Sequence, residues 1–335
     1  MKRPLLIPFT PLYAAGLAFR NWRIESGREP VRRLRFPVVS IGNLSTGGSG
    51  KTPLTIALAR ALQQRGFRVD VLSRGYGRKS KLAARVKADG VAEDFGDEPL
   101  MIARQTGLPV YVAPRRYDAG VMAEADLPQS VGENDPPIVH LLDDGFQHRQ
   151  LARQVDILLL DRRDWQDRLL PAGDLREPLK AVRRASIIAI PADDLELEAE
   201  LRAWGWQNPI WRIHRTMEVP FFDGPVAAFC GIARQEQFFL GLEAAGVKLA
   251  LRRAFPDHFP YTRAVLEELL AKSRAAGATA FVTTEKDLVR LGRLASIFLE
   301  SIPRPVRLSI EIQEQEVAID WIVDQIAPSF TSPLT

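Results

Sequence analysis

A glycine-rich stretch near the start of the chain ends in Gly-Lys-Thr, a combination suited to holding phosphate. Residues 36–52 are FPVVSIGNLSTGGSGKT, and a stretch with helical periodicity follows at 53–66. Glycines let backbone N–H groups close around phosphate oxygens, and a helix that begins here adds the positive end of its dipole. A lysine in this place reaches the β- and γ-phosphates, and a threonine hydroxyl ligates Mg²⁺. We therefore predict a phosphate-binding loop formed by Ser45, Thr46, Gly47, Gly48, Ser49, Gly50, Lys51 and Thr52.

One residue departs from the strict form of this motif, G-x-x-x-x-G-K-[ST], because Ser45 stands where the pattern has glycine. A glycine-rich turn that binds no ligand would also contain several glycines. The apolar run 36–41 before the loop and the helical periodicity after it supply the strand and the helix that the motif requires. We expect a nucleoside triphosphate to bind here, and the absence of the guanine-reading signature N-K-x-D favours ATP.

An acidic pair follows a second apolar run farther along the chain. Residues 138–142 are apolar except for one histidine, and Asp143 and Asp144 come directly after them. An acidic residue at the tip of an apolar strand, downstream of a phosphate-binding loop, holds Mg²⁺ directly or through water. Gln147 and His148 follow a glycine turn, and we expect them to face the same crevice.

Two loops carry arginines at the ends of expected strands. Arg74 and Tyr76 lie in the glycine turn RGYGRKS, and Arg176 lies in the Pro/Gly-punctuated loop LLPAGDLREPL. Exposed arginines are usually solvated, and turn chemistry alone accounts for the glycines. Arginines at the end of a strand can also clamp phosphate, so both interpretations stay open.

Two further residues have a structural and a catalytic interpretation. Asp97, followed by Glu98 and a proline, is typical of a helix N-terminus, where its side chain would cap the helix. His258 lies in the proline-bounded loop FPDHFPYT, and a lone loop histidine is more often incidental than catalytic.

The elements that must position these residues alternate between apolar runs and helical stretches. This alternation predicts an α/β fold, a P-loop NTPase-type, mostly parallel sheet with helices on both faces, plus a smaller C-terminal αβ domain. We assign residues 1–35 to a basic N-terminal segment, 36–208 to the P-loop domain, 209–224 to a connector and 225–330 to the smaller domain.

The N-terminal segment 1–35 is both basic and apolar. No run of 18 uncharged apolar residues occurs in the chain, which argues against a transmembrane helix. Prolines interrupt the apolar stretch, and an exported nucleotide site would lack ATP, so a secretory signal is disfavoured. A helix at about 11–26 has arginines beside Phe19 and Trp22. It is either an interfacial helix at a membrane surface or a helix packed on the protein's own core.

The composition sets broad limits. The chain has 335 residues, of which 46% are hydrophobic and 26% charged, as in globular proteins, and this length suffices for two domains. Its single cysteine excludes an internal disulfide framework and fits a reducing compartment. The net charge of +4 does not indicate a nucleic-acid partner.

Eight motifs, in their order along the chain, resemble the tetraacyldisaccharide 4'-kinase family: VVSIGNLSTGGSGKTP, SRGYGR, GDEP, LLDDGFQHR, LLPAGDLREPL, FCGI, FPDHFPYT and TTEKD. The resemblance extends over nearly the whole chain, and DDGFQHR is far more specific than the phosphate-binding loop. The family tolerates a residue other than glycine where Ser45 stands. Asp174 stands where the family usually has proline, which affects only the detail of that loop.

The resemblance implies an ATP- and Mg²⁺-dependent kinase of lipid A biosynthesis. Such an enzyme phosphorylates the 4'-hydroxyl of a tetraacylated glucosamine disaccharide 1-phosphate and forms lipid IV-A at the cytoplasmic face of the bacterial inner membrane. The N-terminal helix would then contact the membrane surface, and no nucleic acid takes part. The resemblance also implies that Asp97 is the general base, with His258 pairing to it from the second domain. We assign substrate contacts to Arg74, Tyr76, Glu98, Gln147, His148 and Arg176.

Two other functions remain compatible with the residues. A P-loop kinase or ligase of a soluble metabolite would need neither lipid nor detergent for activity. A regulatory P-loop GTPase or metallochaperone would prefer GTP, hydrolyse it slowly and form no phosphorylated small product.

Overall fold

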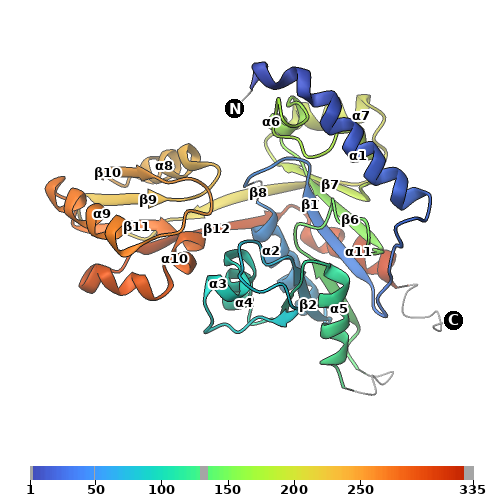
Figure 1. Ribbon diagram of the computed structural model, residues 1–335, viewed down its shortest axis with the longest axis horizontal. Helices are drawn as coiled ribbons and strands as arrows, with labels where there is room; N and C mark the ends of the chain where they lie inside the picture. Colours follow the sequence, from blue (N-terminus) through green and yellow to red (C-terminus); the bar gives the residue numbers. More distant parts are fainter. Residues whose placement is uncertain (1–2, 49, 129–134, 328–335) are drawn as a thin grey trace.

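The computed structural model of the chain describes residues 3–48, 50–128 and 135–327. It has two lobes joined by one continuous 12-stranded sheet (Figure 1). The strands are β1 (Val38–Asn43), β2 (Arg68–Ser73), β3 (Ala84–Arg85), β4 (Val110–Val112), β5 (Ile138–Leu142), β6 (Val155–Leu159), β7 (Ile187–Pro191), β8 (Ile210–Glu218), β9 (Val226–Cys230), β10 (Leu249–Ala254), β11 (Ala280–Thr284) and β12 (Arg304–Ile312). The α-helices are α1 (Thr10–Glu25), α2 (Lys51–Gln64), α3 (Ala92–Phe95), α4 (Asp97–Thr106), α5 (Arg116–Ala125), α6 (Arg162–Trp165), α7 (Leu195–Ala203), α8 (Gln235–Ala244), α9 (Arg263–Ala275), α10 (Glu285–Leu291) and α11 (Gln315–Ile326). Three 3₁₀ segments complete the description: η1 (Pro4–Phe9), η2 (Leu179–Arg184) and η3 (Gly292–Ser301).

The larger lobe is built around β1, at the centre of the order β3-β4-β2-β5-β1-β6-β7-β8. Its strands are parallel apart from the short edge strand β3. Successive side chains of β1 enter different cores: Val39 and Ile41 pack with α2, α4 and α11, whereas Val38 packs with α5. The carboxyl ends of parallel strands meet at one edge of the sheet, so the loops after β1, β2 and β5 lie together. The predicted α/β fold with a mostly parallel P-loop sheet is confirmed.

The smaller lobe uses the same construction on strands β10-β9-β11-β12, which are parallel to one another. Alternate residues of β9 again face opposite ways. Ala227 and Phe229 pack with α9, α10 and η3, whereas Ala228 and Cys230 pack with α8. Each lobe therefore has cores on both faces of its part of the sheet.

Two nine-residue strands run between the lobes (Figure 1). The first residues of β8 pair with β7, and its later residues pair antiparallel with β12, which begins beside β11. This differs from the expectation that residues 209–224 form a connector without regular structure. This two-stranded ribbon is exposed over much of its length, so the polar residues of β8 hide its strand pattern. The final helix also differs from its expected place, because α11 packs on the core of the larger lobe rather than in the smaller domain.

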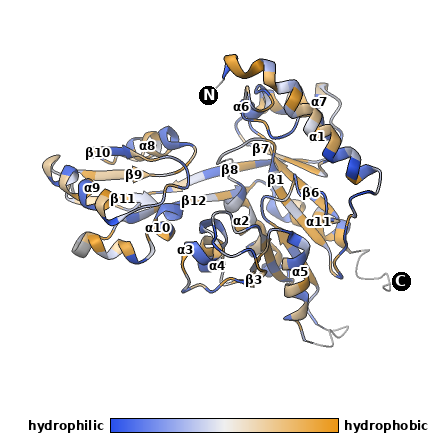
Figure 2. Cartoon of the chain, in the orientation of Figure 1, coloured by the Kyte–Doolittle hydropathy of each residue, from blue (hydrophilic) through white to orange (hydrophobic). Residues whose placement is uncertain are grey.

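The N-terminal helix α1 and the 3₁₀ turn before it lie along the outside of the larger lobe (Figure 2). Ile24 is the one buried residue of α1, whereas Leu12 and Phe19 are 75% and 60% exposed. On the inner side, the Tyr13 hydroxyl donates to the Arg176 carbonyl at 3.1 Å. The helix therefore packs on the larger lobe along one side and exposes apolar residues on the other, and its contact with a membrane stays a prediction. Over the part of the chain that the structure describes, no helix is both long and apolar enough to cross a membrane.

Candidate active site

The loop between β1 and α2 has a backbone shaped for phosphate. Gly47 and Gly50 have φ values of +112° and +92°, in the left-handed region that favours glycine. Gly50 is also the N-cap of α2, so the unpaired N–H groups of the first helical turn face the loop. Ser45, by contrast, forms an antiparallel bridge with Leu175, a conformation that does not require glycine. Ser49, which the sequence also assigns to the loop, lies outside the described residues.

Two cations converge beside this loop. Lys51 Nζ donates to Asn43 Oδ1 at 3.1 Å and to the Gly47 carbonyl at 3.4 Å, and it lies 3.7 Å from Asp144 Oδ1. The Arg176 guanidinium donates to both carboxylate oxygens of Asp144, at 3.0 and 3.2 Å. Burial alone would raise the pKa of Asp144, but Lys51 and Arg176 outweigh it and hold that pKa below its ordinary range. The cluster can therefore exchange internal ion pairs for the negative charges of a polyphosphate.

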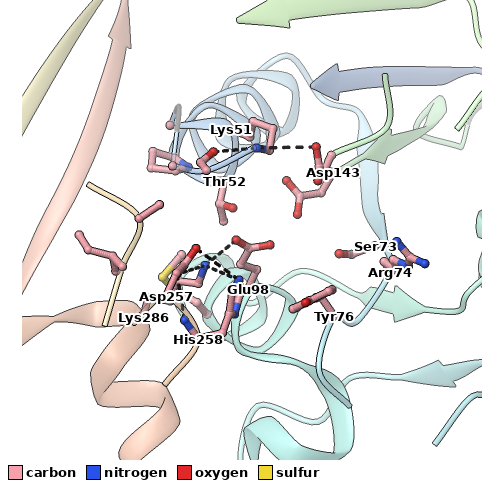
Figure 3. A pocket seen from close by; sticks show the side chains of 18 of the residues that line it. Lys51, Thr52, Ser73, Arg74, Tyr76, Glu98, Asp143, Asp257, His258 and Lys286 are labelled. Carbon is pink, nitrogen blue, oxygen red and sulfur yellow. Dashed lines mark hydrogen bonds and ion pairs between the residues drawn. The ribbon is translucent and has the colours of Figure 1, made fainter. Parts of the chain in front are cut away.

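Asp143 fits one side of a magnesium site. Its Oδ1 accepts the Thr55 hydroxyl at 3.1 Å, whereas its Oδ2 is buried without a hydrogen-bond partner in the described part of the chain. Burial, Glu98 and Asp144 raise its pKa to about 7. Figure 3 places Thr52 and Asp143 on the same side of the cavity.

Mg²⁺ takes one or two carboxylates and completes its shell with phosphate and water, and these residues offer such a partial set. The described residues contain no cluster of three or more His, Cys, Asp and Glu that would hold a metal alone. Asp143, Asp144 and Thr52 therefore suit a metal that arrives together with a nucleotide.

A second polar group joins the two lobes. Asp97 is the first residue of α4 in the larger lobe, and His258 lies in the loop after β10 in the smaller lobe. His258 Nδ1 lies 3.1 Å from Asp97 Oδ2. His258 has a left-handed backbone, with φ of +58°, and its N–H donates to the Gly231 carbonyl at 3.2 Å. A non-glycine residue keeps this conformation only where its surroundings fix it, which is common at functional sites.

Asp97 is not the helix cap that its sequence context allowed. Gly96 occupies the N-cap position of α4, and Asp97 Oδ1 accepts the N–H of the next residue, Glu98, at 2.9 Å. Asp97 is 5% exposed. Burial would raise its pKa, but the hydrogen bond from His258 and the charges of Lys286 and Arg290 outweigh it and hold the pKa below its ordinary range. Asp97 is therefore ionised throughout the physiological pH range.

Helix α10 of the smaller lobe contributes two cations that sequence reasoning missed. Lys286 Nζ donates to Glu98 at 2.9 Å and lies 3.4 Å from His258 Nε2. Arg290 Nε donates to Asp97 Oδ2 at 2.6 Å. The available signal was the polar motif TTEKD after an apolar run. The sequence did not indicate that this motif faces α4 of the other lobe.

The opposite side of the site is basic. Arg116, the first residue of α5, is 6% exposed, and its backbone N–H donates to His148 Nε2 at 3.4 Å. Burial, together with the charges of Arg116, Arg153 and Arg74, lowers the pKa of His148 to about 3, so its imidazole is neutral. Sequence reasoning missed Arg116, although its position directly after an apolar run resembled that of Arg74.

These groups surround one cavity of about 700 Å³ between the lobes (Figure 3). The Tyr76 and His258 rings pack against each other at an angle of 53° with centroids 4.9 Å apart, and Gln147 donates to the Asn43 carbonyl at 2.8 Å. The predicted residues that line the cavity are Thr46, Gly47, Gly48, Gly50, Lys51, Thr52, Arg74, Tyr76, Glu98, Asp143, Asp144, Gln147, His148, Arg176 and His258. Ser45 and Asp97 are buried behind this lining.

The chain is similar to known proteins along nearly its whole length. The family model of tetraacyldisaccharide-1-P 4'-kinase matches residues 2–327. The tetraacyldisaccharide 4'-kinase of Koribacter versatilis is 41% identical over 331 residues, which cover 94% of this chain and 97% of that protein. The protein of the same name from Aquifex aeolicus is 37% identical over 315 residues, or 89% and 93% of the two chains. A crystal structure of LpxK from Aquifex aeolicus in complex with ATP has a TM-score of 0.74 at 34% identity and covers 96% of this chain and 98% of that one.

Proposed function

The chain belongs to the tetraacyldisaccharide-1-P 4'-kinase family, and we propose that it transfers the γ-phosphoryl group of ATP to the 4'-hydroxyl of tetraacyldisaccharide 1-phosphate. The product is lipid IV-A, an intermediate of lipid A biosynthesis. The observation that carries this proposal is that one cavity holds both a phosphate-binding loop and the Asp97–His258 pair. The loop alone would suit any nucleotide hydrolase, whereas the pair supplies the proton acceptor that an alcohol substrate needs.

The donor end of the cavity binds ATP. The backbone of the loop, from Ser45 to Thr52, encloses the phosphates, and Lys51 neutralises charge on the group in transfer. Thr52, Asp143 and Asp144 would hold Mg²⁺, which would supply positive charge beside the phosphates of bound ATP. Arg176 leaves its ion pair with Asp144 as these negative charges enter, and then contacts a phosphate itself.

The acceptor end removes a proton. The 4'-oxygen forms a bond to the γ-phosphorus, the bond from that phosphorus to the β,γ-bridging oxygen breaks, and ADP leaves. The hydroxyl proton passes to the Asp97–His258 pair. A carboxylate whose pKa is depressed is a weak base by itself, so the two residues act as one unit, with His258 facing the cavity and Asp97 buried behind it.

The basic side of the cavity suits the negative 1-phosphate of the acceptor. Arg74 and Arg116 approach from the ends of β2 and β4, and the neutral His148 adds a hydrogen-bonding group between them. We assign Tyr76, Glu98 and Gln147 to contacts with the sugar rings, because they are polar residues that line the same cavity.

The acyl chains call for a membrane surface, and α1 is the element that suits it. Its exposed Leu12 and Phe19, with Leu5 and Phe9 before them, would enter the interfacial region, while neighbouring arginines meet anionic headgroups. Arg20 also lines the cavity, so the helix borders the substrate's path. The enzyme would therefore work as a peripheral protein at the cytoplasmic face of the inner membrane, without a nucleic-acid partner.

The test is a transfer assay in detergent micelles with γ-labelled ATP and the tetraacyl disaccharide 1-phosphate. We expect label in the lipid phase, and none with Lys51→Ala as the control. Label in a water-soluble acceptor, with none in lipid, would indicate a kinase of a soluble metabolite. Preference for GTP, with free phosphate as the one labelled product, would indicate a GTPase. Either result would overturn the proposal.

A further inference from the structure

Arg290 is a cation of α10 whose donors all reach different parts of the site. Its side chain is 7% exposed. Nε donates to Asp97 Oδ2 across the lobe boundary at 2.6 Å, and Nη1 donates to Asp287 Oδ1 at 2.9 Å and to the Gly231 carbonyl. Nη2 lies 3.5 Å from His258 Nδ1. One planar group therefore touches both members of the pair and two anchors in the smaller lobe.

The anchors hold the guanidinium in one orientation. Asp287 is fully buried, and it accepts the Tyr261 hydroxyl at 2.9 Å, the Gly231 N–H at 3.0 Å and the Thr284 hydroxyl at 2.6 Å. A carboxylate with this many donors cannot move without breaking several buried hydrogen bonds. Arg290 is thus fixed to the rigid core of the smaller lobe rather than to a mobile loop.

The same arginine also touches the backbone that supports His258. The Gly231 carbonyl accepts both Arg290 Nη1 and the His258 N–H. A Cβ at Gly231 would lie 3.1 Å from Asp287 Oδ1, so the close approach of these groups depends on glycine. The Arg290 guanidinium consequently fixes both the position of His258 and the contact to Asp97.

We propose that Arg290 is a positioning residue that sets the distance between Asp97 and His258 for proton removal from the acceptor. This inference rests on the proposed function, because it assigns no chemistry of its own to the arginine. Arginine suits the task because its fixed, planar donors can hold three acceptors at once, whereas the ammonium of a lysine is a compact charge on a flexible stem. The other cation of α10, Lys286, donates to Glu98 at 2.9 Å and lies 3.9 Å from Asp97 Oδ2, beyond hydrogen-bond distance.

The charges around Asp97 predict how activity depends on pH. The charged groups at its carboxylate are His258 of the loop and Lys286 and Arg290 of α10, and the carboxylates of Asp257 and Glu98 in turn contact these two cations. Removal of the guanidinium takes away one of the charges that lower the pKa of Asp97. The carboxylate then becomes protonated at a higher pH, and activity on the acid side should be lost at a higher pH.

The experiment compares Arg290→Gln, Arg290→Lys and Arg293→Gln in the full chain with the transfer assay. We expect Arg290→Gln to lower kcat about 10- to 100-fold, since a displacement of about 1 Å can cost 100-fold, while KM for ATP stays within about twofold. The acid limb of its pH–kcat profile should move to higher pH. Arg290→Lys should keep the acid limb in place and recover part of kcat. Arg293, which is exposed three residues along the chain, is the matched control and should behave like the wild type.

Loss of Arg290 leaves Asp287 with one donor fewer, so folding is followed by thermal melting and by ATP binding. The double variant Arg290→Gln/Asp287→Asn removes the buried negative charge and preserves the test if the single variant unfolds. A wild-type kcat and acid limb in Arg290→Gln would overturn the positioning role alone. An unmoved acid limb with equal losses in Arg290→Lys would do the same. A wild-type protein that labels no lipid would instead overturn the proposed function.

Discussion

The Asp97–His258 pair yields a prediction in which the catalytic and structural interpretations differ most. The amide of Asp97→Asn keeps the size of the carboxylate and can still accept the Glu98 N–H. It cannot take a proton, and if its one oxygen accepts the Glu98 N–H, its NH₂ group replaces the oxygen Oδ2 that contacts both His258 and Arg290. Loss of a positioned base costs about 10²- to 10⁴-fold in rate, so we expect kcat to fall within this range.

The size of the structural effect can be worked out separately. Asp97→Asn leaves Lys286 and Arg290 near each other without the shared carboxylate, and breaking one side of a buried ion pair costs roughly 3–5 kcal/mol. This cost lies at the contact between the lobes, so it should weaken that contact as well as lower the melting temperature. His258 is 30% exposed, and His258→Ala should cost far less stability.

The assay is a double-mutant cycle on kcat, with melting temperature and ATP affinity measured for every variant. His258→Ala should lose a similar or smaller factor in kcat than Asp97→Asn. The double variant should be little worse than the worse single variant, because groups that act as one unit are not additive. All variants should still bind ATP. Losses that multiply, or a folded Asp97→Asn with wild-type kcat, would refute the pair as a proton-accepting unit.

Three further predictions concern other parts of the molecule. Lys51→Ala should lower turnover by about 100-fold or more, whereas Arg60→Ala, on the exposed side of the same helix, should have little effect. Near-normal turnover in Lys51→Ala would contradict the assigned ATP site. The double variant Leu12→Ser/Phe19→Ser should bind anionic vesicles on the order of 100-fold more weakly, because each side chain loses roughly 1–2 kcal/mol of interfacial burial. Leu240→Ser, 58% exposed on α8, is its control, and unchanged sedimentation of the double variant would exclude α1 as the membrane contact. Buried His140 contacts Asp70 at 2.8 Å and Glu124 at 3.4 Å, and although burial lowers its pKa, these carboxylates raise it to about 9. The pKa of His140 in the folded protein lies above the ordinary value of about 6.5. The stabilisation by His140 is therefore complete below that pH and is lost as pH rises through about 9. The free energy of unfolding should therefore fall by up to about 3 kcal/mol over this range. His140→Gln should flatten the dependence of this free energy on pH, whereas His214→Gln should not. Equal slopes in the wild type and both variants would contradict this account.

The larger lobe could be predicted from sequence because its signals are local. The apolar run before Gly47 and the helical periodicity after Thr52 each specify one element, and parallel β-strands buried on both faces are almost wholly apolar. Strand β8 was harder to predict, because a strand that spans two lobes is partly exposed and mixes polar with apolar residues. The return of α11 to the larger lobe follows from the path of β12, which no periodicity encodes.

The candidate site could be predicted where neighbouring residues of one motif fix the local structure by themselves. The loop from Ser45 to Thr52 and the acidic pair after β5 are of this kind. The contact between Asp97 and His258 is not, because the two residues are 161 positions apart and meet only through the arrangement of the lobes. Sequence reasoning missed Arg116, Lys286 and Arg290, which begin or lie within helices and act from positions that only the tertiary structure defines.

One measurement tests the central claim most directly: the position of the new phosphate on the product of ATP and tetraacyldisaccharide 1-phosphate. The account predicts a bis-phosphorylated lipid whose mass rises by one phosphate, with a phosphorus–proton correlation from the new phosphate to the 4'-proton of the distal sugar. Lys51→Ala should give no such product under the same conditions. A phosphate on any other hydroxyl, or ADP formed with the lipid unchanged, would contradict the account.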